Sequence, residues 1–129
     1  MDRKTVLLVD DNRTHQYSLG KHLEGSGFRV LRAHTGAEAM DLATSKHPDV
    51  VLLDINLPDI TGFDVCQRLK SAPNTESIPV VFHSATHETQ AARDQATDLG
   101  AVSFLSYPIS VEHLVRVLQG ALVRGTTGR

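Results

Sequence analysis

The amino-acid sequence holds one cysteine, Cys66, and no tryptophan among its 129 residues. A single cysteine excludes an internal disulfide and a zinc site built from several cysteines, and it is typical of a reducing compartment. The longest apolar runs have about four residues, whereas about 20 are needed to span a bilayer. No small-residue cleavage site accompanies the apolar run after Met1-Asp2-Arg3-Lys4, which disfavours a signal peptide. We therefore expect a soluble, cytoplasmic protein with no membrane partner.

The sequence also lacks an excess of charge of either sign. Its 13 Lys and Arg residues against 15 Asp and Glu residues give a net charge of −2. Proteins that hold nucleic acid by long-range attraction carry a positive field, so we expect no nucleic-acid partner. The length corresponds to one domain, and a composition of 40% hydrophobic and 22% charged residues is ordinary for a globular protein.

Short apolar runs alternate along the chain with segments of helical spacing. The runs are typical of strands buried on both faces of a parallel sheet, and they occur at 6–9, 28–31, 50–53, 78–82 and 102–105. The segments with helical spacing are 12–24, 35–46, 62–71, 88–99 and 111–124. Ser110 and Gly125 are the candidate N-cap and C-cap of the last helix. This alternation predicts an α/β protein with a parallel sheet and helices on both of its faces.

Carboxylates stand where two of the predicted strands end. Asp10 and Asp11 follow the first strand, and Asp54 follows the third. If the strand order is 2-1-3-4-5, these strands are neighbours and the three carboxylates converge at the edge where ligands bind in such sheets. Two such charges about 4 Å apart repel by roughly 4 kcal/mol, and a divalent cation with oxygen ligands, Mg²⁺ or Mn²⁺, compensates for this. The alternative is that one or two of them cap helices or lie solvated in turns.

Three motifs together resemble those of bacterial response-regulator receiver domains. They are Val-Asp-Asp at 9–11, Leu-Leu-Asp-Ile-Asn-Leu-Pro-Asp-Ile-Thr-Gly at 52–62 and Ile-Pro-Val-Val-Phe-His-Ser-Ala at 78–85. In the middle motif, the aspartate, Pro58 and Gly62 stand at the family's spacing. The resemblance implies a flavodoxin-like, doubly wound (βα)5 three-layer sandwich with a five-stranded parallel sheet of order 2-1-3-4-5. We expect the receiver domain over 1–124, with 125–129 as a tail or linker stub.

The resemblance also implies roles for the acidic residues. Asp54 matches the phosphoacceptor, a carboxylate nucleophile that takes a phosphoryl group from a histidine kinase. Asp11, Asp54 and the backbone carbonyl of Asn56 match the Mg²⁺ ligands, with Asp10 acting through a metal-bound water. Asn56 matches a position that tunes the lifetime of the phosphoryl group, as does Thr86.

The expected switch residues follow the fourth strand and lie in and after the fifth. Ser84 matches a hydroxyl that moves toward the phosphoryl group, although a turn or capping role explains a serine equally well there. Phe104 matches an aromatic residue that swings inward with it. The family has a lysine where this chain has Tyr107, and a tyrosine hydroxyl carries no positive charge at neutral pH. The Tyr107–Pro108 bond matches a cis bond of the family.

Three other basic groups near the site are candidates to compensate for the lost lysine: Arg13, His83 and His87. We interpret them as solvated loop residues. None of the seven histidines is paired at i and i+4, and we interpret the set as surface residues without a metal-binding or phosphohistidine role.

Two functions remain open. The first is a phosphorylation-controlled binding module with two kinds of partner, a sensor histidine kinase or phosphotransfer protein and a downstream effector. The effector would bind the face formed by helix four, strand five and helix five, which is also a candidate homodimer surface. The second is a degenerate, phosphorylation-independent interaction module. We expect no turnover enzyme: a phosphatase would need a general acid where Asn56 stands, and Asp10 and Asp11 would repel the phosphate of a flavin.

Overall fold

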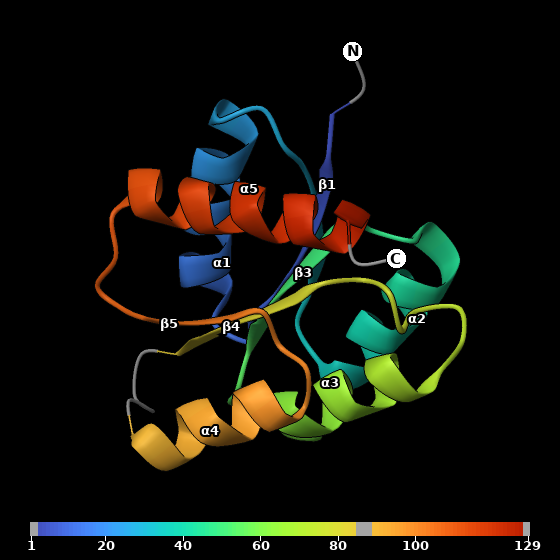
Figure 1. The fold of residues 1–129 in the computed structure, drawn as a ribbon. Helices are drawn as coiled ribbons and strands as arrows, with labels where there is room; N and C mark the ends of the chain where they lie inside the picture. Colours follow the sequence, from blue (N-terminus) through green and yellow to red (C-terminus); the bar gives the residue numbers. More distant parts are fainter. Residues whose placement is uncertain (1–2, 85–88, 128–129) are drawn as a thin grey trace.

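The computed structural model describes residues 3–84 and 89–127, and in these ranges five strands alternate with five helices (Figure 1). The elements are β1 (Thr5–Val9), α1 (Arg13–Gly25), β2 (Arg29–Ala33), α2 (Gly36–Lys46), β3 (Val50–Asp54), α3 (Gly62–Ser71), β4 (Val80–Ser84), α4 (Gln90–Asp98), β5 (Ser103–Ser106) and α5 (Val111–Thr127). The strands pair in parallel in the order β2-β1-β3-β4-β5. The predicted flavodoxin-like, doubly wound sandwich is therefore confirmed.

The sheet separates two hydrophobic cores, because successive side chains of a strand point to opposite faces. On β1, Leu7 and Val9 belong to the core under α2, α3 and α4, whereas Val6 and Leu8 belong to the core under α1 and α5. All four side chains are fully buried. Figure 1 shows α1 and α5 on one side of the sheet and the other three helices on the opposite side. Burial on both faces explains why the strands are continuous apolar runs in the sequence.

Each helix begins at a residue whose side-chain oxygen accepts a hydrogen bond from a backbone N–H of the first turn. These residues are Asn12, Thr35, Thr61, Thr89 and Ser110, with donor–acceptor distances of 2.9 to 3.2 Å. The predicted cap at Ser110 is therefore confirmed. Such caps satisfy backbone donors that a helix start leaves unpaired. They fix the points at which the chain leaves the strand ends, where the candidate site lies.

The end of the last helix differs from the prediction. Helix α5 continues to Thr127, so Gly125 lies within it and is not a C-cap. A glycine ends a helix only where the chain turns into the left-handed region, and inside a helix it costs about 1 kcal/mol relative to alanine. Within residues 3–84 and 89–127, no helix has both the length and the apolar character needed to cross a bilayer.

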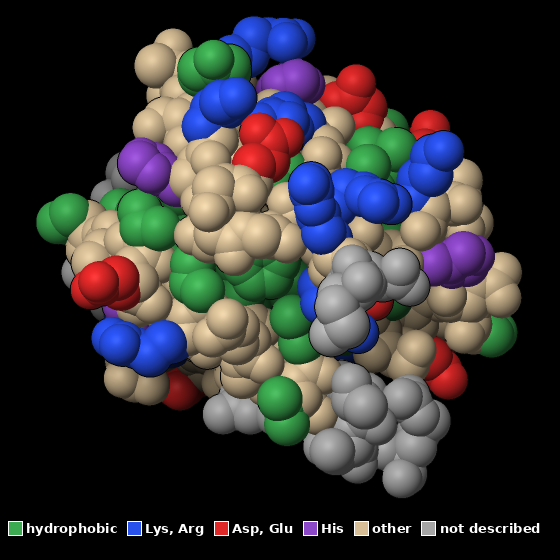
Figure 2. Space-filling view, turned by 90° about the horizontal axis from the view of Figure 1, so that it is seen from above, with side chains coloured by type: hydrophobic (Ala, Val, Ile, Leu, Met, Phe, Trp, Pro, Cys, Tyr) green, Lys and Arg blue, Asp and Glu red, His purple; other side chains and the backbone are tan. Residues whose placement is uncertain are grey.

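The surface at the end of the molecule where β1 begins carries charges of both signs. Figure 2 shows Lys and Arg side chains interspersed with Asp and Glu side chains on this face.

Gly62, the first residue of α3, lies very close to the end of β3. A Cβ atom added at Gly62 would lie 2.2 Å from the backbone oxygen of Asp54, and the Gly62 N–H donates to the carbonyl of Ile55 at 2.8 Å.

We predict that Gly62→Ala lowers the free energy of unfolding by about 2 to 4 kcal/mol, because backbone atoms must move to make room. Chemical denaturation measures this loss. Gly120→Ala is the matched control, since a Cβ there meets nothing within 4 Å, and it should be neutral or stabilising. Equal effects of the two substitutions would contradict the prediction.

Candidate functional site

The carboxyl ends of β1, β3, β4 and β5 surround an open pocket of about 410 Å³. Eight described residues line it: Asp10, Asp11, Asn12, His15, Asp54, Asn56, His83 and Tyr107. Five of them are residues that the sequence marked as site residues. The sheet order produces this convergence, because β1 lies between β2 and β3 and ends at the same edge as β3.

Three carboxylates meet in the pocket. Asp10, Asp11 and Asp54 each place an oxygen within 4.8 Å of the others, with Asp10 buried, Asp54 half-buried and Asp11 exposed. The three carboxylates therefore lie together, as predicted from the sequence. Oxygen donors at this spacing fit a hard divalent cation such as Mg²⁺ better than they fit zinc.

Asp54 ends β3 and is held in an unfavourable electrostatic environment. Its Oδ1 accepts a hydrogen bond from the backbone N–H of Asn56 at 3.1 Å. Burial, followed by the charges of Asp10 and Asp11, raises the pKa of Asp54 from 3.8 to about 7. The N–H bond lowers the pKa but does not offset these two effects. A cation in the pocket would favour the ionised form of Asp54.

Asp10 has the opposite balance. Its Oδ1 accepts from the backbone N–H of Asn12 at 2.9 Å, and its Oδ2 lies 2.5 Å from Nδ1 of His15. Burial by itself would raise the pKa of Asp10, but these hydrogen bonds and the histidine charges lower it below its ordinary value. The hydrogen bond to Asp10 in turn raises the pKa of His15. His15 is thus a partly exposed histidine, as expected of a surface residue, but it is paired with Asp10 and lines the pocket.

His83 was misassigned as a solvated loop residue. It pairs in register with Asp54, its side chain is buried, and its Nε2 donates to the backbone oxygen of Val9 at 3.3 Å. Burial lowers the pKa of His83 to about 4, so it is neutral near pH 7. Arg13 contacts His34 at 3.5 Å and does not line the pocket, and His87 and Thr86 lie outside the described residues.

Tyr107 fills the position where the sequence departs from the resemblance. The Tyr107–Pro108 bond is cis, as the resemblance implies. Burial, followed by the charges of Asp10 and Asp54, raises the pKa of Tyr107, so the phenol stays neutral. Its hydroxyl is buried and has no hydrogen-bond partner among the described residues. The ring lies edge-on to His15 and His83, with centroid distances of 4.9 and 5.5 Å.

A family model of the response regulator receiver domain matches residues 6–119. The chain belongs to this family. Such receivers are modules of two-component signalling. A relative, the polar-differentiation response regulator DivK of Brucella ovis, is 32% identical over 119 residues, which cover 92% of this chain and 96% of DivK.

Solved receiver structures superpose on nearly the whole chain. Chemotaxis protein CheY4 of Vibrio cholerae has a TM-score of 0.86 at 26% identity, and the match covers 93% of this chain and 99% of CheY4. The receiver domain of the sensor histidine kinase PA1611 from Pseudomonas aeruginosa has a TM-score of 0.86 at 25% identity, covering 95% of this chain and 99% of that one. The PA1611 structure holds a magnesium ion in its active-site cleft.

The two remaining residues that the resemblance marks as switch residues, Ser84 and Phe104, lie outside the pocket lining. Ser84 is buried at the end of β4 and pairs in register with Ser106 of β5. Phe104 is half-buried, and the guanidinium of Arg93 on α4 lies 4.9 Å from the centre of its ring. Arg93 also donates to the backbone oxygen of Phe104 at 3.2 Å and to Oγ of Ser106 at 3.0 Å. Arg93 therefore joins α4 to β5 at the predicted switch aromatic.

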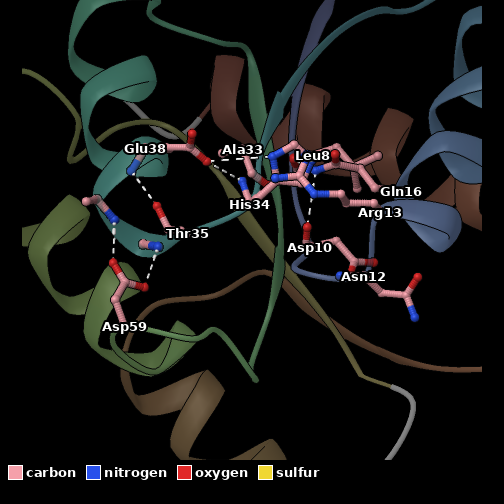
Figure 3. Close-up of polar contacts among 12 residues, drawn as sticks. Leu8, Asp10, Asn12, Arg13, Gln16, Ala33, His34, Thr35, Glu38 and Asp59 are labelled. Atoms are coloured by element: carbon pink, nitrogen blue, oxygen red, sulfur yellow. Dashed lines mark hydrogen bonds and ion pairs between the residues drawn. The ribbon is translucent and has the colours of Figure 1, made fainter.

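Two polar side chains that the sequence did not single out support the walls of the site. Gln16 is buried, and its Nε2 donates to the backbone oxygens of Leu8 and Ala33 at 3.0 and 2.7 Å (Figure 3). Asp59 accepts hydrogen bonds from the N–H groups of Gly36 and Ala37 at the start of α2, at 2.8 and 3.0 Å (Figure 3). Gln16 ties the ends of β1 and β2 together, and Asp59 ties the loop after β3 to α2. Neither contact is local in the sequence.

Asp54 should make the stability of the metal-free receiver depend on pH. Because its pKa is raised from 3.8 to about 7 on folding, the folded state holds this proton more tightly. The resulting stabilisation is present at low pH and is lost as the pH rises from about 4 to about 7. We predict that the free energy of unfolding of Asp54→Asn, relative to the wild type, increases over this range by at most about 1.4 kcal/mol per pH unit.

Urea denaturation in the presence of a chelator, between pH 4 and pH 8, measures this difference. Asp98→Asn, on the exposed surface of α4, is the control for removing a negative charge outside the pocket. A constant difference between Asp54→Asn and the wild type across the range would contradict the prediction.

Arg93 should contribute to both stability and the position of Phe104. We predict that Arg93→Ala lowers the free energy of unfolding by about 1 to 3 kcal/mol, because two hydrogen bonds and the ring contact are lost. Arg93→Lys should recover only part of this, since a lysine keeps the charge without the forked donors. Denaturation measures the first effect, and the ring signals of Phe104 in NMR spectra report the second. Arg68→Ala, on the exposed side of α3, is the control, and equal losses for Arg68→Ala and Arg93→Ala would rule out this role.

Proposed function

We propose that this receiver accepts a phosphoryl group on Asp54 with Mg²⁺ in the pocket, and that phosphorylation changes a protein-binding surface. The observation that carries the proposal is the cluster of three carboxylates within 4.8 Å, in which the pKa of Asp54 is raised to about 7. A fold without a bound cation gains nothing from this arrangement, because the like charges repel each other. A receiver that no longer used the site would have no physical reason to keep all three.

The phosphoryl donor is the phosphohistidine of a sensor histidine kinase or a phosphotransfer protein. A carboxylate oxygen of Asp54 attacks the phosphorus, a P–O bond forms, the P–N bond breaks, and the imidazole of the donor leaves with the electron pair. Asp11, Asp54 and the backbone carbonyl of Asn56 would hold Mg²⁺, with Asp10 acting through a water molecule. When bound, the ion would neutralise part of the negative charge on the phosphoryl group during transfer. The magnesium in the PA1611 receiver supports this choice of metal.

The output surface of the receiver is the face formed by α4, β5 and α5, where Ser84 and Phe104 would transmit phosphorylation to an effector or to a second copy of the chain. Arg93 supports this choice, because it couples α4 directly to Phe104. The receiver acts as a cytoplasmic signalling module and not as a turnover enzyme.

A second candidate is a receiver that binds its partner without phosphorylation. The observation that favours it is Tyr107, which is neutral and whose hydroxyl has no partner among the described residues. Without the lysine of the family, the phosphoryl group lacks its usual charged partner on this side of the pocket.

Beryllofluoride with Mg²⁺ mimics the acyl phosphate and distinguishes the two candidates. We predict that its addition to the ¹⁵N-labelled wild-type protein shifts amide signals around Asp54 and along β5 and α4. Asp54→Ala should abolish these shifts. An unchanged wild-type spectrum would refute phosphorylation control and leave the phosphate-independent candidate. If shifts appear only near Asp54 and Tyr107→Lys extends them to β5, then the acceptor is intact and its readout is weakened.

A further inference from the structure

Three aromatic rings from distant parts of the sequence meet beside the phosphoacceptor pocket. His15 comes from the first turn of α1, His83 from β4, and Tyr107 follows β5. The ring of Tyr107 is nearly perpendicular to both histidine rings, and the centroids of His15 and His83 are 6.1 Å apart. We call these three residues the ring cluster. It joins the ends of three structural elements on one side of the pocket.

Within the ring cluster, His15 is the member that contacts an acidic residue of the site. Its Nδ1 lies against Oδ2 of Asp10, while the backbone N–H of Asn12 donates to Oδ1 of the same carboxylate. Both oxygens of Asp10 are thereby held, and the residue is only 1% exposed. A buried carboxylate fixed at both oxygens presents one orientation to the pocket.

His83 does not have this role. Its Nε2 donates to the backbone oxygen of Val9, and its side chain is buried. Tyr107 contributes its ring and not its hydroxyl, which has no hydrogen-bond partner among the described residues. His15 therefore combines a hydrogen bond to Asp10 with a ring contact to Tyr107.

We propose that His15 is a positioning residue of the phosphoacceptor site, which orients the Asp10 carboxylate through Nδ1–H and couples it to Tyr107 through its ring. The inference rests on the proposed function, because the orientation of Asp10 matters only if the pocket receives a metal and a phosphoryl group.

Two substitutions of His15 separate its hydrogen bond to Asp10 from its ring contact with Tyr107. His15→Phe keeps a ring beside Tyr107 and removes the donor to Asp10. His15→Asn keeps a donor at the position of Nδ1 and removes the ring. The side chain of His15 is 38% exposed, so both replacements have room. His22→Phe and His22→Asn, at an exposed histidine of the same helix, are the matched controls.

Beryllofluoride with Mg²⁺ is titrated into each full-length variant, and amide NMR shifts give both the affinity and the extent of the response. We expect His15→Phe to bind 10- to 100-fold more weakly than the wild type, the usual effect of removing a group that orients a metal-site carboxylate. We expect His15→Asn to retain near wild-type affinity but to show smaller shifts at Tyr107 and along β5. The His22 variants should match the wild type in both measurements.

The possible failures are distinguishable. No response of the wild-type protein overturns the proposed function and this inference together. A responding wild type with unchanged affinity in His15→Phe, or with equal weakening in His15→Phe and His15→Asn, overturns the inference alone, because a merely structural histidine would not be rescued by the retained donor. If His15→Phe does not fold, His15→Leu, which also lacks the donor, replaces it in the comparison.

Discussion

Repulsion among three carboxylates is the constraint on which the rest of the site depends. Asp10, Asp11 and Asp54 are brought together because β1 and β3 are adjacent and parallel and end at the same edge. The backbone N–H groups of residues 12 and 56 donate to two of these carboxylates. The next helix starts so close to the end of β3 that a Cβ atom at Gly62 would clash with the backbone of Asp54. The sheet therefore brings the carboxylates together, and N–H groups of the loops after β1 and β3 offset part of their repulsion.

The pKa values of two aspartates in this pocket are shifted in opposite directions. Asp10 has a pKa below its ordinary value because His15 and a backbone N–H stabilise the charged form against the cost of burial. Asp54 has a pKa raised to about 7 because burial and its two acidic neighbours outweigh a single N–H bond. Asp10 thus holds its charge near neutral pH, whereas the charge of Asp54 responds to a cation that enters the pocket.

Tyr107 changes the way in which the pocket is connected to the rest of the domain. A lysine would reach the pocket as a flexible cation, whereas Tyr107 packs as a rigid, neutral ring against two histidines. On the other face of β5, Arg93 of α4 covers Phe104 and bonds to Ser106. The end of β5 is thus held between the ring cluster on one side and a guanidinium on the other. Any movement of the end of β5 must therefore change one of these two sets of contacts.

The sequence by itself determined the elements, the strand order through its motif resemblance, and the meeting of Asp10, Asp11 and Asp54. The elements follow from local periodicity and caps, and the strand order is what the resemblance implies. Given that order, the meeting of the carboxylates follows from the rule that parallel strands end at one edge. Only the tertiary structure decided that His15 and His83 belong to the site and that Gly125 lies inside α5. The physical reason is that a histidine on a helix or a strand has the same local pattern whether it faces solvent or a carboxylate. Its partner is chosen by how α1 packs on the sheet and by the place of β4 beside β3, which spacing along the chain does not encode.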